Sequence, residues 1–194
     1  GSQIINSYNL GTISGGGYAL LGGLVGTDGF IFNGGAFDVT PSSLPTIANS
    51  FNAGAIASSG SNETIGGLIG QFDYTSTNGT TYIQNTYNLA ELTGSSSTIC
   101  GLIGLTGAPV NISSSFNAGY VGSGHNAIIG TLNGSSGTFT NVYYDSSTSG
   151  SSSSYTGVTA ETTAQLQSSS LAGFTAGTWG LASGMYPYLS TIYT

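Results

Sequence analysis

The sequence contains no lysine and no arginine among its 194 residues. Its seven acidic residues give a net charge of −7 and leave only 4% of the chain charged, against roughly 25% in an ordinary soluble domain. Binding to nucleic acid or to anionic lipid depends on cationic side chains, so we expect neither partner. Lysine nucleophiles and arginine clamps for phosphate or carboxylate are excluded for the same reason.

Cysteine, histidine and long apolar runs are also scarce. Cys100 is the only cysteine and cannot form a disulfide within the chain. With one histidine, His125, the chain offers no cluster of metal ligands, and we expect no metal and no cofactor. No run approaches the roughly 18 apolar residues of a membrane helix, so we expect no membrane span.

The residues that are abundant indicate a folded protein. Ser, Thr, Gly and Asn make up more than half of the chain, yet 38% of the residues are hydrophobic, and these include 12 Tyr and 8 Phe. This is not the composition of a disordered segment, which has low hydrophobicity and high charge. The length suits a single domain with a substantial core.

Two short motifs alternate four times along the chain. The first reads Asn/Ser, Ser/Thr, aromatic, Asn and lies within residues 5–13, 48–56, 84–92 and 113–121, with a partial fifth copy at 140–145. The second, Gly-Gly-aliphatic-aliphatic-Gly with variations, lies at 22–26, 66–70, 100–104 and 127–130. The first motif supplies five aromatic anchors of the repeat core: Tyr8, Phe51, Tyr87, Phe116 and Tyr143.

Repeats of unequal spacing indicate a solenoid, because inserted residues can leave as loops while the stacked strands keep their register. Frequent Gly and many β-branched and aromatic residues favour strands over helices. The aromatic anchors are expected to form an interior ladder. The column Asn9, Asn52, Asn88 and Asn117 either forms a second ladder with left-handed backbone or holds Asn only because Asn suits turns. The glycine-rich motif is expected to be one buried strand that turns tightly at both ends.

The predicted fold is therefore all-β, a right-handed parallel β-solenoid of about six coils over residues 1–145. Residues 146–158 are rich in Ser and Gly and are expected to form a loop. Residues 159–194 are expected to cap the last coil, beginning with a short helix at 159–167.

The two alternating motifs resemble the GLUG-type repeats of filamentous-haemagglutinin-like bacterial surface adhesins. The tail is similar to the closing order of that family, with Asn-Val-Tyr-Tyr-Asp at 141–145, Thr-Thr-Ala-Gln-Leu at 162–166 and Tyr-Pro-Tyr-Leu at 186–189. The resemblance covers residues 5–189 and implies a β-solenoid on an exported surface protein, with no catalytic residues to transfer. The chain departs from the family in lacking Lys and Arg and in having Tyr144 where Trp is frequent.

Catalytic and modification sites are weakly indicated. No position of the repeat recurrently holds an acid, so we interpret the acids as loop residues rather than as the carboxylate pair of a polysaccharide-degrading enzyme; they are Asp28, Asp38, Glu63, Asp73, Glu91, Asp145 and Glu161. His125 is interpreted as a loop residue and Cys100 as a small core thiol. Four N-glycosylation sequons, about the number expected by chance, begin at Asn62, Asn78, Asn111 and Asn133.

The leading hypothesis is a non-enzymatic structural or adhesive protein, extracellular or on the cell surface. It would be an adhesin repeat domain or a self-assembling filament subunit that associates end to end or laterally, because a solenoid exposes strand edges. The alternative is a carbohydrate-binding module that holds surface glycans on exposed tyrosines, for which the candidates are Tyr18, Tyr74, Tyr82 and Tyr120.

Overall fold

The computed structural model describes residues 3–27, 46–72, 79–95, 98–132 and 136–192. Within these ranges the chain is almost entirely β-structure, with one four-residue helix, which confirms the predicted all-β class. None of the described residues belongs to a helix long and apolar enough to cross a membrane.

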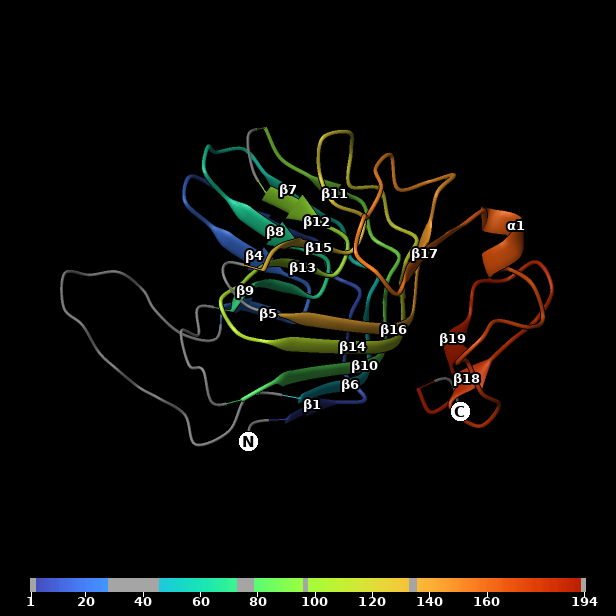
Figure 1. Cartoon of the computed structure of the whole chain (residues 1–194). Coiled ribbons are helices and arrows are strands. Elements are labelled where there is room, and N and C mark those ends of the chain that lie inside the picture. The colour runs from blue at the N-terminus through green and yellow to red at the C-terminus, as the bar shows by residue number, and fades with distance from the viewer. Residues whose placement is uncertain (1–2, 28–45, 73–78, 96–97, 133–135, 193–194) are drawn as a thin grey trace.

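Most of the strands belong to four parallel sheets (Figure 1). The main sheet contains β1 (Gln3–Ile5), β2 (Tyr8–Asn9), β6 (Thr46–Asn52), β10 (Thr81–Asn88), β14 (Val110–Asn117), β16 (Gly137–Asp145) and β17 (Val158–Glu161). The second contains β3 (Ile13–Gly15), β7 (Ile56–Ser58) and β11 (Leu92–Thr93). The third contains β4 (Leu20–Gly22), β8 (Thr64–Gly66) and β12 (Thr98–Cys100). The fourth contains β5 (Val25–Thr27), β9 (Ile69–Phe72), β13 (Ile103–Thr106) and β15 (Ile129–Thr131).

The chain visits the four sheets in the same order three times, and we call each such run a passage. A fourth passage contributes described strands only to the main and fourth sheets, and a fifth only to the main sheet. Passages begin at β1, β6, β10, β14 and β16, and each main-sheet strand pairs in parallel with the strand of the next passage. The register places Ile47, Ile83 and Ile112 in one column that points into the core between the sheets. Within residues 1–145 the described strands form five passages, one fewer than the predicted number of coils.

The glycine-rich motif forms a corner, and the prediction that it is a single buried strand is wrong. Its first residues end one strand and its last residues begin the next, so that β8 ends at Gly66 and β9 begins at Ile69. A Cβ on Gly67 would lie 2.1 Å from the Gly101 carbonyl oxygen and 2.6 Å from Cγ of Asn88. Glycine is therefore required where the corner of one passage touches the asparagine column of the next.

One residue with left-handed backbone bends each of the long strands β6, β10, β14 and β16, and an equivalent residue separates β1 from β2. These residues, with φ between 46° and 53°, are Asn6, Asn49, Asn85, Ser114 and Asn141. The prediction placed left-handed backbone at the asparagine column that begins at Asn9. The left-handed residues lie three positions earlier instead, so this part of the prediction is wrong. The bend interrupts the two-residue alternation of the strand: Ile83 packs in the core between the sheets, whereas Tyr87 packs in a separate cluster on the flank.

The Ser-rich residues 146–157 form turns, bends and one isolated bridge at Ser152, and they hydrogen-bond to an earlier part of the chain. The Ser149 carbonyl accepts from Val121 N–H at 2.9 Å, and the Ser152 carbonyl accepts from Ala127 N–H at 3.0 Å. This segment therefore lies along the fourth passage. Val158, the last residue of the predicted loop, belongs to β17.

The C-terminal segment, residues 162–192, contains the helix and two short strands. Helix α1 (Thr163–Leu166) is N-capped by Thr162 in a capping box with Gln165, and β18 (Trp179–Gly180) pairs antiparallel with β19 (Tyr188–Leu189). The predicted helix exists but is shorter than 159–167, because residues 159–161 continue β17. Of the predicted capping segment, β17 pairs with the outer edge of β16. Residues 162–192 instead lie along the flank of the main sheet (Figure 1), against Tyr87, Phe116 and Tyr143 from three passages.

Candidate functional site

The aromatic anchors form a stacked column on the flank of the main sheet. Ring centroids are 5.3 Å apart between Tyr8 and Phe51, 4.7 Å between Phe51 and Tyr87, and 5.1 Å between Tyr87 and Phe116, with ring planes within 11° of parallel. Tyr143 follows in register with Phe116, and its hydroxyl donates to the Ala172 carbonyl at 3.1 Å.

The anchors thus form a ladder in which Phe51, Tyr87 and Phe116 are fully buried, but their rings belong to a different core cluster from the one between the sheets. They are covered by Leu166, Phe174, Trp179 and Leu189 of the C-terminal segment. Trp179 lies 5.9 Å from the ring of Tyr87 and 6.1 Å from that of Phe116. Tyr8, in the first passage, is 54% exposed, so the cover does not extend to this end.

The asparagine column is a continuous ladder of side-chain hydrogen bonds, which decides between the two interpretations of the sequence. Asn9 Nδ2 donates to Asn52 Oδ1 at 2.8 Å, Asn52 to Asn88 at 2.9 Å, and Asn88 to Asn117 at 2.8 Å. The last three are fully buried. Sequence reasoning missed a second polar column beside it, in which Thr86 N–H donates to Ser115 Oγ at 3.1 Å; the recurring Ser or Thr before each aromatic was the available signal.

Apolar side chains remain exposed next to the uncovered end of the aromatic column. Leu10 and Leu89 occupy equivalent positions directly after the ladder residues Asn9 and Asn88, and they are 63% and 38% exposed. Together with Tyr8 they form what we call the apolar strip. Contiguous patches of exposed apolar side chains mark contact surfaces more often than single exposed apolar residues do.

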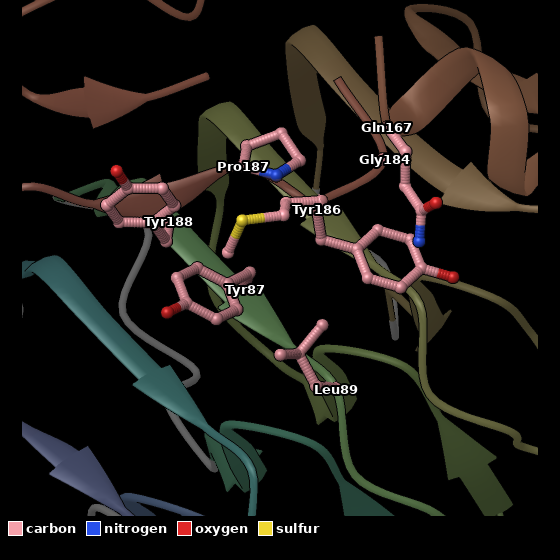
Figure 2. A pocket seen from close by; sticks show the side chains of 8 residues that line it. Tyr87, Leu89, Gln167, Gly184, Tyr186, Pro187 and Tyr188 are labelled. Atoms are coloured by element: carbon pink, nitrogen blue, oxygen red, sulfur yellow. The ribbon is translucent and has the colours of Figure 1, made fainter. Parts of the chain in front are cut away.

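Leu89 of the apolar strip also lines a groove of about 590 Å³ between the third passage and the C-terminal segment (Figure 2). The groove is lined by Tyr87, Leu89, Gln167, Gly184, Met185, Tyr186, Pro187 and Tyr188. Gly184, at φ 82°, forms the turn that presents Met185, which is 55% exposed.

Local packing holds the two tyrosine walls of this groove. Tyr188 lies over Gly180, where an added Cβ would be 2.2 Å from its ring. Tyr186 stacks on Phe116 at 6.1 Å and donates its hydroxyl to Asp145 Oδ2 at 2.6 Å. Burial, and then the Asp145 carboxylate, raise the pKa of Tyr186 to about 12.

Asp145 fastens the C-terminal segment to the end of β16. The side chain is fully buried and accepts from Ser147 N–H at 2.8 Å, from Thr163 Oγ1 at 2.7 Å and from Tyr186. Glu161 is its neighbour in register on β17. This is the only pair of acids that register brings together in the described strands, and the buried, bonded Asp145 is not placed to act on a substrate.

The other residues considered for chemistry are dispersed. Glu63 is buried and Glu91 exposed, while Asp28, Asp38 and Asp73 lie outside the described residues. His125 and Cys100 border a smaller cavity of about 360 Å³, and burial raises the pKa of Cys100 to about 12, as expected for a core thiol. No group of three potential metal ligands occurs in the described part of the chain.

The tyrosines proposed for glycan binding do not form one platform. Tyr18, Tyr82 and Tyr120 are 77%, 50% and 47% exposed, but they come from the β3–β4 turn, from β10 and from the segment after β14. Tyr74 lies outside the described residues. Of the sequons, Asn62 is exposed in a turn and Asn111 is half-buried in β14, while Asn78 and Asn133 lie outside the described residues.

In comparisons with known proteins, the chain matches no protein-family model, no curated protein and no solved structure. Its function is therefore inferred from its own residues and their arrangement.

Proposed function

We propose that this protein is a non-enzymatic structural or adhesive protein of the cell surface or extracellular space, with a body that is a right-handed parallel β-solenoid of GLUG-like repeats. Support comes from the recurrence of the same columns in successive passages: Ile in the core, Asn in the hydrogen-bonded ladder and aromatic rings on the flank. Repeating units of this kind bury their apolar faces by stacking on one another. The hydroxyl-rich, cation-free composition and the resemblance to surface adhesins support the location.

The observation that carries the proposal is the pair of strand edges at the two ends of the main sheet. Among the described strands, β1 and β2 pair only with β6, and β17 pairs only with β16. All three run parallel to their neighbours, and β17 continues the columns of Tyr8 and Asn9, so β17 of one copy can pair in the same register with β2 of the next. This contact joins two different surfaces, and contacts of that type propagate into filaments when they do not close into a ring.

The scarcity of charged residues favours such stacking when salt reduces the electrostatic repulsion between copies. With no Lys or Arg and 4% charged residues, few ions would need to be desolvated at the contact. The net charge of −7 repels copies from each other at low ionic strength. Salt screens this repulsion, because the Debye length falls to about 8 Å at physiological ionic strength, so assembly should increase with salt.

Electron microscopy and sedimentation of the protein over a range of concentration and salt test the proposal. Filaments should appear with a fibre-diffraction spacing of about 4.8 Å along their axis. Single particles at every concentration and salt level would contradict the assembly and favour a monomeric binding module.

A variant pair tests the β2 edge. Leu89 N–H donates to the carbonyl of Asn52 in the preceding passage, and the equivalent Leu10 N–H faces the open side, because the first passage has no preceding one among the described strands. Leu10→Pro removes this donor and should abolish assembly. The matched Leu10→Thr keeps the donor and should assemble, and equal assembly of both variants would refute the β2 contact. Leu10 is 63% exposed, so neither change should disturb the core.

A further inference from the structure

The groove beside the C-terminal segment has features of a ligand site that the proposed stacking does not use. Its lining comes from the third passage and from residues 167 and 184–188, not from the edges of β1, β2 and β17 that no other described strand pairs with. A volume of about 590 Å³ lies within the range of roughly 300–1,000 Å³ that is usual for small-molecule sites.

The walls of the groove are already in place without a ligand. Tyr186 is fixed by its hydrogen bond to Asp145 and by stacking on Phe116, and Tyr188 by its seat over Gly180. The floor ring, Tyr87, is held in the aromatic column at 4.7 Å and 5.1 Å from its neighbours. Preformed walls reduce the entropy that a bound ligand must overcome.

The chemistry of the lining selects a neutral ligand with one apolar face and one polar edge. Rings and apolar side chains dominate the lining, and no Asp, Glu or His borders the groove. The Gln167 side-chain amide also borders it (Figure 2) and has no hydrogen bond to any other described residue. An anionic ligand would find no cationic side chain, because the chain contains no Lys or Arg and its one histidine, His125, does not line the groove.

We propose that this groove binds a neutral saccharide. The apolar face of a sugar ring would rest on the tyrosine walls and Met185, and its hydroxyl edge would exchange hydrogen bonds with the Gln167 amide. A purely apolar protein segment fits less well, since it would cover Gln167 and leave a polar amide without a partner. Figure 2 shows Gln167 and Tyr188 on opposite sides of the groove, so a ligand could contact both chemistries at once.

Calorimetric titration with cellohexaose, mannohexaose and maltohexaose, and with hexagalacturonate as the charged comparison, tests the proposal. At least one neutral hexamer should bind, and hexagalacturonate should bind at least tenfold more weakly. Gln167→Leu removes the amide and Met185→Glu adds a charge, and each should weaken binding about tenfold or more. Tyr82→Ala and Tyr18→Ala remove exposed tyrosines elsewhere and should change the affinity less than twofold.

Several results would overturn this assignment. They are the absence of binding by all three neutral hexamers at millimolar concentration, equal binding of hexagalacturonate, and a loss of binding in Tyr82→Ala or Tyr18→Ala that matches the groove variants. If no hexamer binds and Met185→Glu instead disperses associated protein, the groove is a contact between copies and the saccharide assignment is wrong. Titrating the Leu10→Pro protein separates the two proposals, because Leu10 does not line the groove and saccharide binding should persist in this variant whether or not filaments form.

Discussion

Replacing Asn88 by alanine tests the asparagine ladder at its centre. The Asn88 side chain makes four hydrogen bonds: to Asn117 at 2.8 Å, from Asn52 at 2.9 Å, and to the carbonyl and from the N–H of Ala90 at 3.1 Å and 3.2 Å. In Asn88→Ala, Asn52 Nδ2 and Ala90 N–H lose these acceptors inside a fully buried column. A buried donor without a partner costs about 1–3 kcal/mol, so the free energy of unfolding should fall by about 3–5 kcal/mol.

Asn9→Ala is the matched control at the end of the ladder. Asn9 also donates to its neighbour in the next passage, at 2.8 Å, but it is only half-buried, so water can replace the lost partner. The expected cost is about 1 kcal/mol. Equilibrium urea unfolding followed by far-ultraviolet circular dichroism measures both variants. Equal costs for the two variants, or a cost below about 1 kcal/mol for Asn88→Ala, would refute the claim that burial gives the ladder its stabilising effect.

Three further predictions concern the corner glycine, the flank and the thiol. Gly67→Ala should lower the free energy of unfolding by about 2 kcal/mol or more, because its Cβ would meet a carbonyl oxygen at 2.1 Å, whereas Gly17→Ala, with nothing within 4 Å, should change it by less than about 0.5 kcal/mol. The pKa of Tyr186 is raised from 10.0 to about 12 in the folded protein, so the stabilisation that Tyr186 gives is complete below pH 10 and is lost as the pH rises to 12. The fluorescence emission of Trp179 should shift to the red between pH 10 and 12, and this shift should be smaller in Tyr186→Phe. Cys100, with a pKa of about 12 and 1% exposure, should resist thiol reagents at pH 8 until the protein is unfolded.

The parallel strands and the asparagine ladder could be predicted because they depend on the repeat alone. The first motif recurs in each passage, so residues at equivalent positions fall opposite each other whatever the length of the intervening loops. Asn52 and Asn88 show this: 36 residues separate them, yet their side chains bond directly.

The side of the sheet on which the aromatic rings lie could not be read from the repeat. In a regular strand, Ile83 and Tyr87 would point to the same face because they are four residues apart. The left-handed residue between them, Asn85 at φ 52°, breaks this alternation. Asn is among the non-glycine residues that most readily adopt left-handed backbone. The first Asn of each motif was therefore the available signal for the bend. The residue type alone could not distinguish it from the ladder Asn three positions later.

The position of the C-terminal segment depends on contacts between residues far apart in the chain. Trp179 and Phe174 have no repeat partners, and only the three-dimensional structure shows that they pack on Phe116. The same applies to the groove, because its two sides come from residues 87–89 and 167–188. Neither side contains a motif that would identify a site on its own.

The outward turn of the aromatic column connects the fold to the proposed assembly. A column of rings on the flank needs a cover, and the C-terminal segment supplies one for Tyr87 and Phe116 but leaves Tyr8 54% exposed. At the opposite end of the main sheet, register places Thr159 of β17 in line with the same column. If β17 of one copy pairs with β2 of the next, Thr159 meets the exposed ring of Tyr8, and the contact that continues the sheet also buries the uncovered end of the column.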